Sequence, residues 1–351
     1  MKYFRNSLIV AVVFFIASAC EKNDDNPDPK MITFIANGLE GRIINELTTS
    51  NNLIVAATDN GLYSKTIGTD QWQSAGLATI NVRTFIQINQ NLWLAAEKEL
   101  AQESFRIFKS ENKGLNWTEI DSNYGKDFPE QINDFEYISG TQKLYAAGNA
   151  VIAESTDLGE TWTPVVGDWG FVATGLDFVV KHPTQDFLWA GGQNGIEGFT
   201  LNRYDIIQDA NQSWINLIPS PSTAKAILFD PTDAGKITIG AEGGIIQSTD
   251  DGDNWEILKE EENVGRFIFG LARNNSTPQT IYAAGWVKNF DTPQALILSV
   301  SRDNGASWEY HVHNDNTLFG GVWDMISVTE NGKQVLYLGL FKGGVYKVIL
   351  D

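Results

Sequence analysis

Charged and polar side chains recur near the start of short apolar segments throughout this chain of 351 residues. Aligning the segments gives one residue in each: Asn45, Arg83, Asp134, Asp177, Lys225, Gly270 and Asp324. If the fold brings these positions together, three carboxylates, one arginine and one lysine share a single opening. Such a mixed group binds a zwitterionic or polyhydroxylated ligand, or its charges pair with one another and with water.

Paired carboxylates are also the groups that glycoside hydrolysis requires, because one acid protonates the leaving oxygen while the other acts as base or nucleophile. The candidate acids are Asp134, Asp177 and Asp324. An inverting pair lies about 6.5–9.5 Å apart and a retaining pair about 5–5.5 Å apart. A glycoside hydrolase or lyase is therefore the alternative to a purely binding role.

Aromatic residues accompany these charges in polar stretches that we expect to form longer loops, at 97–104, 193–205 and 286–294. Trp286, with Phe290 and Tyr204, lies in such a stretch, and Trp323 stands beside Asp324. Exposed aromatic rings beside carboxylates suit stacking on sugars or other flat ligands. We therefore add Trp286 and Trp323 to the candidate ligand-binding residues, the alternative being that these rings are packed inside the fold.

Other kinds of site are poorly supported. His311 and His313 form an H-x-H pair without a third ligand at metal-binding spacing. No Ser-His-Asp arrangement is legible, with only His182 left as a base, and no phosphate-binding glycine loop is present. An acidic loop such as "DDGD" (250–253) leaves a Ca²⁺ ion open, but no EF-hand pattern exists. We therefore expect neither a metal site nor a cofactor.

One polar turn recurs along the chain and ends each time in tryptophan. Its copies are "SKTIGTDQW" (64–72), "SENKGLNW" (110–117), "STDLGETW" (155–162), "STDDGDNW" (248–255) and "SRDNGASW" (301–308), with a weak sixth, "QDANQSW" (208–214). The aspartates can accept hydrogen bonds from turn amides, the glycines allow positive φ, and the tryptophans can pack against a sheet. We expect a structural role for the nine such residues of the three best copies: Asp157, Gly159, Trp162, Asp250, Gly252, Trp255, Asp303, Gly305 and Trp308.

The turn resembles the Asp-box, or BNR repeat, of β-propellers such as sialidases, xyloglucanases, the sortilin ectodomain and the photosystem II stability/assembly factor group. The resemblance covers nearly the whole chain and implies a fold rather than a chemistry. Sialidases carry an arginine triad and an F/Y-R-I-P motif, and "FRIF" (105–108) here lies where a third strand belongs instead. A single propeller with plain loops is most similar to the assembly-factor group.

A second repeat fixes the number of units. Seven short apolar segments end in small residues: "NLIVAAT" (52–58), "NLWLAAE" (91–97), "KLYAAGN" (143–149), "FLWAGGQ" (187–193), "KITIGAE" (236–242), "TIYAAGW" (280–286) and "VLYLGLF" (335–341). The tryptophans of the turns are 41 to 53 residues apart, a period that suits four-stranded blades. We therefore predict an all-β fold, a seven-bladed β-propeller of four-stranded antiparallel blades over residues 31–351, the last blade closed by the N-terminal strand "KMITFIA" (30–36).

The N-terminus predicts export and anchoring. Residues 1–19 combine Lys2 and Arg5 with an apolar run, as a lipoprotein signal peptide does, and "ASAC" resembles a lipobox ending at Cys20. Residues 20–30 are acidic and predict a flexible tether, similar to the surface-export signal of Bacteroidetes lipoproteins. We expect Cys20 to be lipidated and the protein to be an outer-membrane lipoprotein, exposed at the surface of a Gram-negative cell and attached by this lipid alone.

The net charge of −19 disfavours nucleic acid as a partner. We therefore expect a monomeric, non-enzymatic binding or scaffold protein. Its ligand is a glycan, a small molecule or a partner protein, captured on the loop face by Arg83, Asp134, Asp177, Lys225, Trp286 and Trp323.

Overall fold

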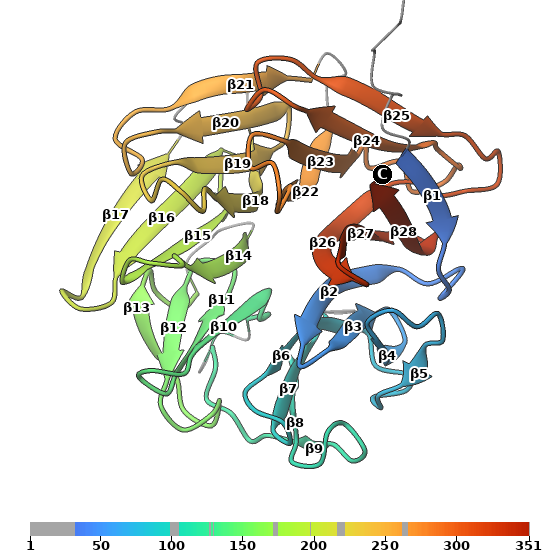
Figure 1. Ribbon diagram of the computed structural model, residues 1–351. Coiled ribbons are helices and arrows are strands. Elements are labelled where there is room, and N and C mark those ends of the chain that lie inside the picture. The colour runs from blue at the N-terminus through green and yellow to red at the C-terminus, as the bar shows by residue number, and fades with distance from the viewer. Residues whose placement is uncertain are drawn as a thin grey trace, which may run out of the picture. The chain divides into compact units, whose positions relative to one another are not determined.

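The computed structural model describes residues 32–98, 105–125, 128, 130–170, 175–196, 198–215, 222–261 and 266–350. These residues form 28 strands and no helix, in seven four-stranded antiparallel sheets that surround a central axis (Figure 1). The predicted seven-bladed β-propeller is thus confirmed. The expected signal peptide, Cys20 and the tether lie outside the described residues. No helix in the described part of the chain is long and apolar enough to cross a membrane.

Blades 1 to 6 are simple meanders in which consecutive strands pair. Blades 1 to 3 are formed by β2 (Ile44–Ser50), β3 (Leu53–Thr58), β4 (Gly61–Thr66) and β5 (Gln73–Ser74); by β6 (Val82–Gln87), β7 (Trp93–Glu97), β8 (Ile107–Ser110) and β9 (Thr118–Glu119); and by β10 (Asp134–Ile138), β11 (Lys143–Ala147), β12 (Ile152–Ser155) and β13 (Thr163–Val166). Blades 4 and 5 are formed by β14 (Gly175–Lys181), β15 (Phe187–Gln193), β16 (Phe199–Asp205) and β17 (Ala210–Ile215), and by β18 (Ala224–Phe229), β19 (Ile237–Ala241), β20 (Gly244–Ser248) and β21 (Glu256–Glu260). Blade 6 is formed by β22 (Phe267–Arg273), β23 (Ile281–Trp286), β24 (Leu296–Ser301) and β25 (Glu309–His313).

The two ends of the described chain meet in blade 7. This blade contains β26 (Val322–Glu330), β27 (Lys333–Leu340), β28 (Gly344–Leu350) and β1 (Ile32–Ala36). β1 is antiparallel to β28, with Ile32 opposite Leu350 and Ala36 opposite Tyr346. The prediction that the N-terminal segment completes the last blade is confirmed, and the closed ring has no unpaired seam between its first and last units.

The apolar core is divided among the contacts between blades. Seven clusters of buried side chains each join two consecutive blades, including one between blades 7 and 1 that contains Ile44, Ile54 and Tyr337. In each blade, the second strand from the axis is almost fully buried and carries small residues such as Ala56 and Ala95. Each blade is therefore stabilised mainly by its neighbours, because a four-stranded sheet alone cannot bury both faces.

The repeated turn joins the third and fourth strands of a blade. In the copy at 155–162, Ser155 Oγ donates to Asp157 Oδ1 (2.8 Å) and accepts from the Gly159 amide (2.9 Å). Asp157 Oδ1 accepts from the Thr161 amide (2.8 Å), and Trp162 Nε1 donates to the Gly159 carbonyl (2.9 Å). The copies at 248–255 and 301–308 repeat these bonds. The turns therefore hold the two outer strands together, on the face opposite the starts of the innermost strands.

Blade 4 differs from our expectation. Most of the predicted loop at 193–205 is strand β16, because its residues pair along their length with β15 and β17. Tyr204 is consequently buried, with its hydroxyl donating to Asp209 Oδ1 (2.8 Å). The weak repeat at 208–214 belongs to the β16–β17 turn and to β17 itself.

Candidate functional site

A β-bulge near the start of the innermost strand aims one side chain of most blades at the central axis. The ladder between the first two strands skips one residue in blades 1, 2, 4, 5, 6 and 7: Asn45, Arg83, Asp177, Lys225, Phe269 and Trp323. All six line one cavity, together with Asn133 of blade 3. Bulges commonly redirect a side chain in this way.

Our sequence alignment is therefore wrong by one residue in three blades. Asp134, Gly270 and Asp324 follow the axis-facing position instead of occupying it, so their counterparts there are Asn133, Phe269 and Trp323. In blades 6 and 7 the cause is the extra residue of the bulge, which the pattern of apolar residues does not reveal.

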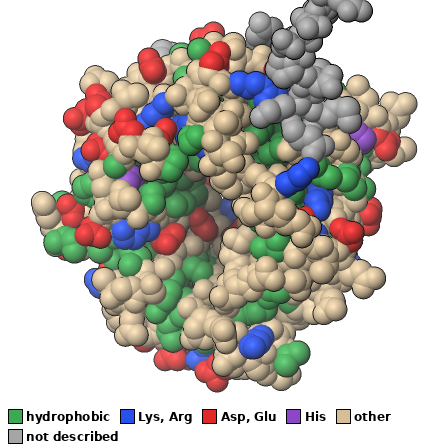
Figure 2. Space-filling model, viewed as in Figure 1, with side chains coloured by type: hydrophobic (Ala, Val, Ile, Leu, Met, Phe, Trp, Pro, Cys, Tyr) green, Lys and Arg blue, Asp and Glu red, His purple; other side chains and the backbone are tan. Residues whose placement is uncertain are grey.

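The cavity has a volume of about 340 Å³ and lies at the centre of the ring, where Figure 2 shows a hollow with acidic side chains on its wall. We call it the funnel. Arg83, Asp134, Asp177, Lys225 and Trp323 line it, as does Asp324. The structure thus brings together all of the predicted binding residues except Trp286, which is described next.

Trp286 lies behind the wall of the funnel. Its side chain is only 1% exposed, and its ring packs against those of Trp323, Phe341 and Phe290 at centroid distances of 5.0, 4.8 and 4.9 Å. The expectation of an exposed loop aromatic at this position is therefore incorrect, because Trp286 ends strand β23 and is covered by neighbouring rings. Trp286 therefore packs behind Trp323 and is not among the residues that line the funnel.

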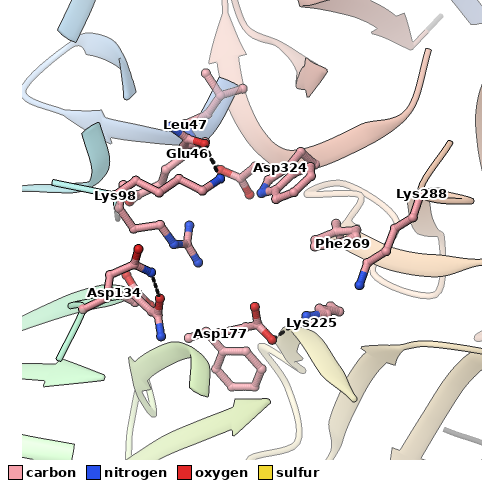
Figure 3. A pocket seen from close by; sticks show the side chains of 15 residues that line it. Glu46, Leu47, Lys98, Asp134, Asp177, Lys225, Phe269, Lys288 and Asp324 are labelled. Atoms are coloured by element: carbon pink, nitrogen blue, oxygen red, sulfur yellow. Dashed lines mark hydrogen bonds and ion pairs between the residues drawn. The ribbon is translucent and has the colours of Figure 1, made fainter. Parts of the chain in front are cut away.

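Three funnel carboxylates tie neighbouring blades together. Asp324 Oδ2 of blade 7 accepts from the Leu47 amide of blade 1 (2.5 Å), as Figure 3 shows. Glu46 Oε2 accepts in the same way from the Phe85 amide of blade 2 (3.0 Å). Asp134 Oδ2 of blade 3 accepts from the Val179 amide of blade 4 (2.8 Å).

These bonds satisfy main-chain amides on the exposed edge of the neighbouring blade. The innermost strand of each blade is a sheet edge, and an amide on this edge lacks a partner in its own ladder. Glu46, Asp134 and Asp324 occupy equivalent positions, because each immediately follows the axis-facing residue of its blade. Sequence analysis missed Glu46, although recognising the bulge would have aligned it with the other two acids.

Burial changes the charge of these acids. It raises the pKa of Glu46 to about 7, with a further contribution from the charge of Asp324. Burial also raises the pKa of Asp324 to about 6 and that of Asp134 well above its usual range, with Glu46 adding to the latter effect. The funnel therefore carries less negative charge near neutral pH than its acids suggest.

Four cations surround the same space: Arg83, Lys98, Lys225 and Lys288. Lys225 Nζ forms an ion pair with Asp177 Oδ2 (2.6 Å). Lys98 Nζ donates to Asn45 Oδ1 (2.9 Å) and lies 4.8 Å from the centroid of the Trp323 ring. Lys288 Nζ lies 3.7 Å from the centroid of the Phe267 ring.

Three of these cations have no acidic partner within ion-pair distance among the described residues: Arg83, Lys98 and Lys288. Burial, followed by the charge of Arg83, lowers the pKa of Lys98 to about 8. Sequence analysis missed both lysines as site residues, although they lie in or beside the stretches 97–104 and 286–294 that it singled out. The arrangement is suited to an anionic group, with Trp323 and Phe269 providing apolar surface beside the charges.

The acids are less well arranged for hydrolysis. Asp134 and Asp324 each accept main-chain amides, and Asp177 is neutralised by Lys225. His182 is buried, with Nδ1 accepting from the Gln185 amide (3.0 Å) and Nε2 lying 3.1 Å from the Ala234 carbonyl. No group of three potential metal ligands occurs in the described part of the chain.

The fold and the site together define a seven-bladed β-propeller with a charged central funnel. Known structures share this architecture. YCF48, in a structure described as bound to D1 peptide, is 17% identical, with a TM-score of 0.64 over 92% of this chain and 98% of that one. No family model and no curated protein matches the sequence.

Two extracellular domains from B. thetaiotaomicron have the same fold. The extracellular domain of the hybrid two-component system BT4673 is 15% identical with a TM-score of 0.63, and that of BT3049 is 12% identical with a TM-score of 0.64. This chain is covered over 91% in both comparisons, but it spans only 40% and 42% of those domains. At these identities the likeness concerns the fold.

Proposed function

We propose that this protein is a non-enzymatic binding protein whose funnel captures an anionic segment of a partner protein. The observation that carries the proposal is the imbalance of charge in the funnel. Arg83, Lys98 and Lys288 have no ion-pair partner among the described residues, whereas the acids are bonded to main-chain amides or to Lys225. A carboxylate entering the funnel would meet charged donors at little electrostatic cost.

Two further observations favour a protein segment as the ligand. Large apolar side chains are exposed on loops of the funnel face: Ile196 (80%), Phe290 (47%) and Val287 (41%). Exposed apolar groups around a polar site are typical of protein-binding surfaces. YCF48, which has the same fold, is described with a bound peptide.

The proposed location is the cell surface. Residues 1–19 would direct export, a lipid on Cys20 would anchor the chain in the outer membrane, and residues 20–30 would hold the propeller away from the bilayer. Metabolic labelling with a fatty-acid analogue should mark the protein and should fail to mark Cys20→Ser. Labelling of that variant would overturn the anchor.

The funnel is tested with a fluorescein-labelled hexaglutamate peptide and its hexaglutamine counterpart, followed by fluorescence anisotropy. We expect only the glutamate peptide to bind, with affinity falling as salt increases. Because a hydrogen bond to a charged group contributes about 1.5–3 kcal/mol, Arg83→Gln with Lys98→Gln should weaken binding at least about tenfold.

Lys113→Gln is the matched control, since Lys113 is exposed on a turn of the opposite face. Like each of the two funnel substitutions, it removes one positive charge, but it should leave the affinity for the hexaglutamate peptide unchanged. Equal binding of both peptides, absence of binding by the glutamate peptide, or insensitivity to the funnel substitutions would contradict the proposal.

A further inference from the structure

A second cavity lies between blades 3 and 4, apart from the funnel. Its volume of about 410 Å³ exceeds that of the funnel. It is bounded by the β11–β12 turn at 149–150, the end of β13 with the residues at 167–168, the β15–β16 loop at 193–195, and side chains of β16 and β17. It therefore opens on the same face of the propeller as the funnel and is large enough for a small ligand.

The chemistry of this cavity differs from that of the funnel. Its polar lining is dominated by side-chain amides and hydroxyls: Asn149, Gln193, Asn194, Thr200, Asn202, Asn211 and Ser213. Asp168 is the one charged residue among its described lining residues, and it is exposed. Ala150, Val166 and Leu176 supply aliphatic surface.

The polar side chains interrupt a seam that is otherwise apolar. The same face of blade 4 contributes Leu188, Ala190 and Tyr204 to the core cluster shared with blade 3. Asn202 lies opposite Ala190 in the β15–β16 ladder, so it belongs to this face. Amide and hydroxyl groups in a place where blades usually bury apolar side chains reduce the packing between them, which indicates a role other than stability.

Asn202 is the central group of this lining. Its side chain is only 8% exposed, and its Oδ1 accepts from Ser213 Oγ (2.7 Å) and Asn211 Nδ2 (3.3 Å). Asn211 Nδ2 also donates to Ser213 Oγ (2.8 Å), which orients the group. Asn202 Nδ2, in contrast, donates to no described residue. This donor is therefore available to a ligand or a water molecule in the cavity.

We infer that this cavity is a second binding site, which takes a neutral, hydroxyl-rich ligand of one or two sugar units. A sugar hydroxyl both donates and accepts, as does each side-chain amide, so the two match without net charge. The aliphatic side chains can contact the C–H face of a sugar ring. The absence of a cation among the described lining residues disfavours an anion. This site is separate from the funnel, and its test does not depend on the funnel's ligand.

The test uses the full-length protein and saturation-transfer NMR with glucose, galactose, mannose and xylose, and with maltose, cellobiose, lactose and xylobiose. At least one of these saccharides should bind, and isothermal titration should give its affinity. Asn202→Leu keeps the approximate size of the side chain but removes its hydrogen bonds, and should weaken binding at least tenfold. Thr200→Val, which removes only a hydroxyl group, should weaken it severalfold and serves if the first variant does not fold.

Asn91→Ala is the control, because Asn91 is exposed on the β6–β7 turn of the opposite face. Its affinity should equal that of the unaltered protein. The inference is overturned if none of the eight saccharides binds, if the affinity is unchanged in a folded Asn202→Leu or Thr200→Val protein, or if glucuronate binds more tightly than glucose. Hexaglutamate binding at the funnel should be the same in all three variants, so the two proposals fail independently.

Discussion

The glycines of the repeated turns have nearly the same backbone angle but different surroundings. Gly159 and Gly305 have φ values of +95° and +94°. A Cβ atom added at Gly159 would lie 3.5 Å from the nearest neighbouring atom, on Trp162, whereas at Gly305 it would lie 2.4 Å from Leu258. Substitutions at Gly159 and Gly305 therefore distinguish the cost of backbone strain alone from the cost of strain together with steric overlap.

We predict that Gly159→Ala destabilises the protein by about 1–2 kcal/mol, the cost of placing a residue with a Cβ in the left-handed region. Gly305→Ala should cost distinctly more, because the Leu258 side chain must also move. Urea unfolding of the two variants measures the difference. Equal losses would show that the contact with Leu258 relaxes freely, and no loss in Gly159→Ala would contradict the strain argument.

Single residues were predictable where a local bond determines them. The roles expected for Asp157, Gly159 and Trp162 follow from bonds within one short turn. Trp286 was not predictable in this way, because its burial depends on Trp323 and Phe341, which belong to the next blade. A polar sequence around an aromatic residue does not reveal rings that arrive from a distant segment.

In the innermost strands, one residue lines the funnel and the adjacent residue can bond to the next blade. The bulged residue faces the axis, and the neighbouring acid, where present, bonds to the next blade, as Asn45 and Glu46 do in blade 1. The sequence indicated the strands and their order, because apolar periodicity repeats in every blade. It did not indicate the bulges, whose extra residue leaves no distinct mark in composition, and the identification of the funnel residues was therefore only partly correct.

The inter-blade acids should make stability depend on pH. Glu46 and Asp324 have folded-state pKa values of about 7 and about 6, raised from 4.5 and 3.8 by burial. Because the folded state binds these protons more tightly than the unfolded state, their contribution is complete below about pH 4 and is lost as pH rises towards about 7. Glu46→Gln, which cannot ionise, should flatten this part of the profile.

Urea unfolding at pH 5, 6, 7 and 8 measures the effect. The free energy of unfolding should decrease less with pH in Glu46→Gln than in the unaltered protein. Glu256→Gln is a suitable control, since Glu256 is exposed at the outer strand β21. Parallel profiles for Glu46→Gln and the unaltered protein would show that Glu46 does not contribute to this dependence.

The ring as a whole depends on the pairing of β1 with β28. Ile32 and Phe34 pack against the core cluster of blades 6 and 7, and Phe34 stacks on His313 with a centroid distance of 5.7 Å. Removing β1 would uncover part of this cluster and leave β28 as an open sheet edge. The overall fold was the most predictable property of the chain, since seven similar units and a missing last strand allow few other closures.

We predict that a chain beginning at Asn37 melts at a lower temperature and forms oligomers through the exposed edge of β28, whereas a chain beginning at Met31 remains monomeric. Differential scanning calorimetry and light scattering measure the two properties. The same melting temperature and mass for both chains would mean that β1 is dispensable for closure.

The pairing of β1 with β28 determines at what stage of synthesis the ring can close. Ribosomes make β1 before any other strand described here and β28 after all of them. Local hairpins such as β2–β3 can form during synthesis, but β1 has no partner until β28 has been made. Closing the ring therefore joins the two strands that lie farthest apart in the described sequence, and such a contact forms slowly because of its loop entropy.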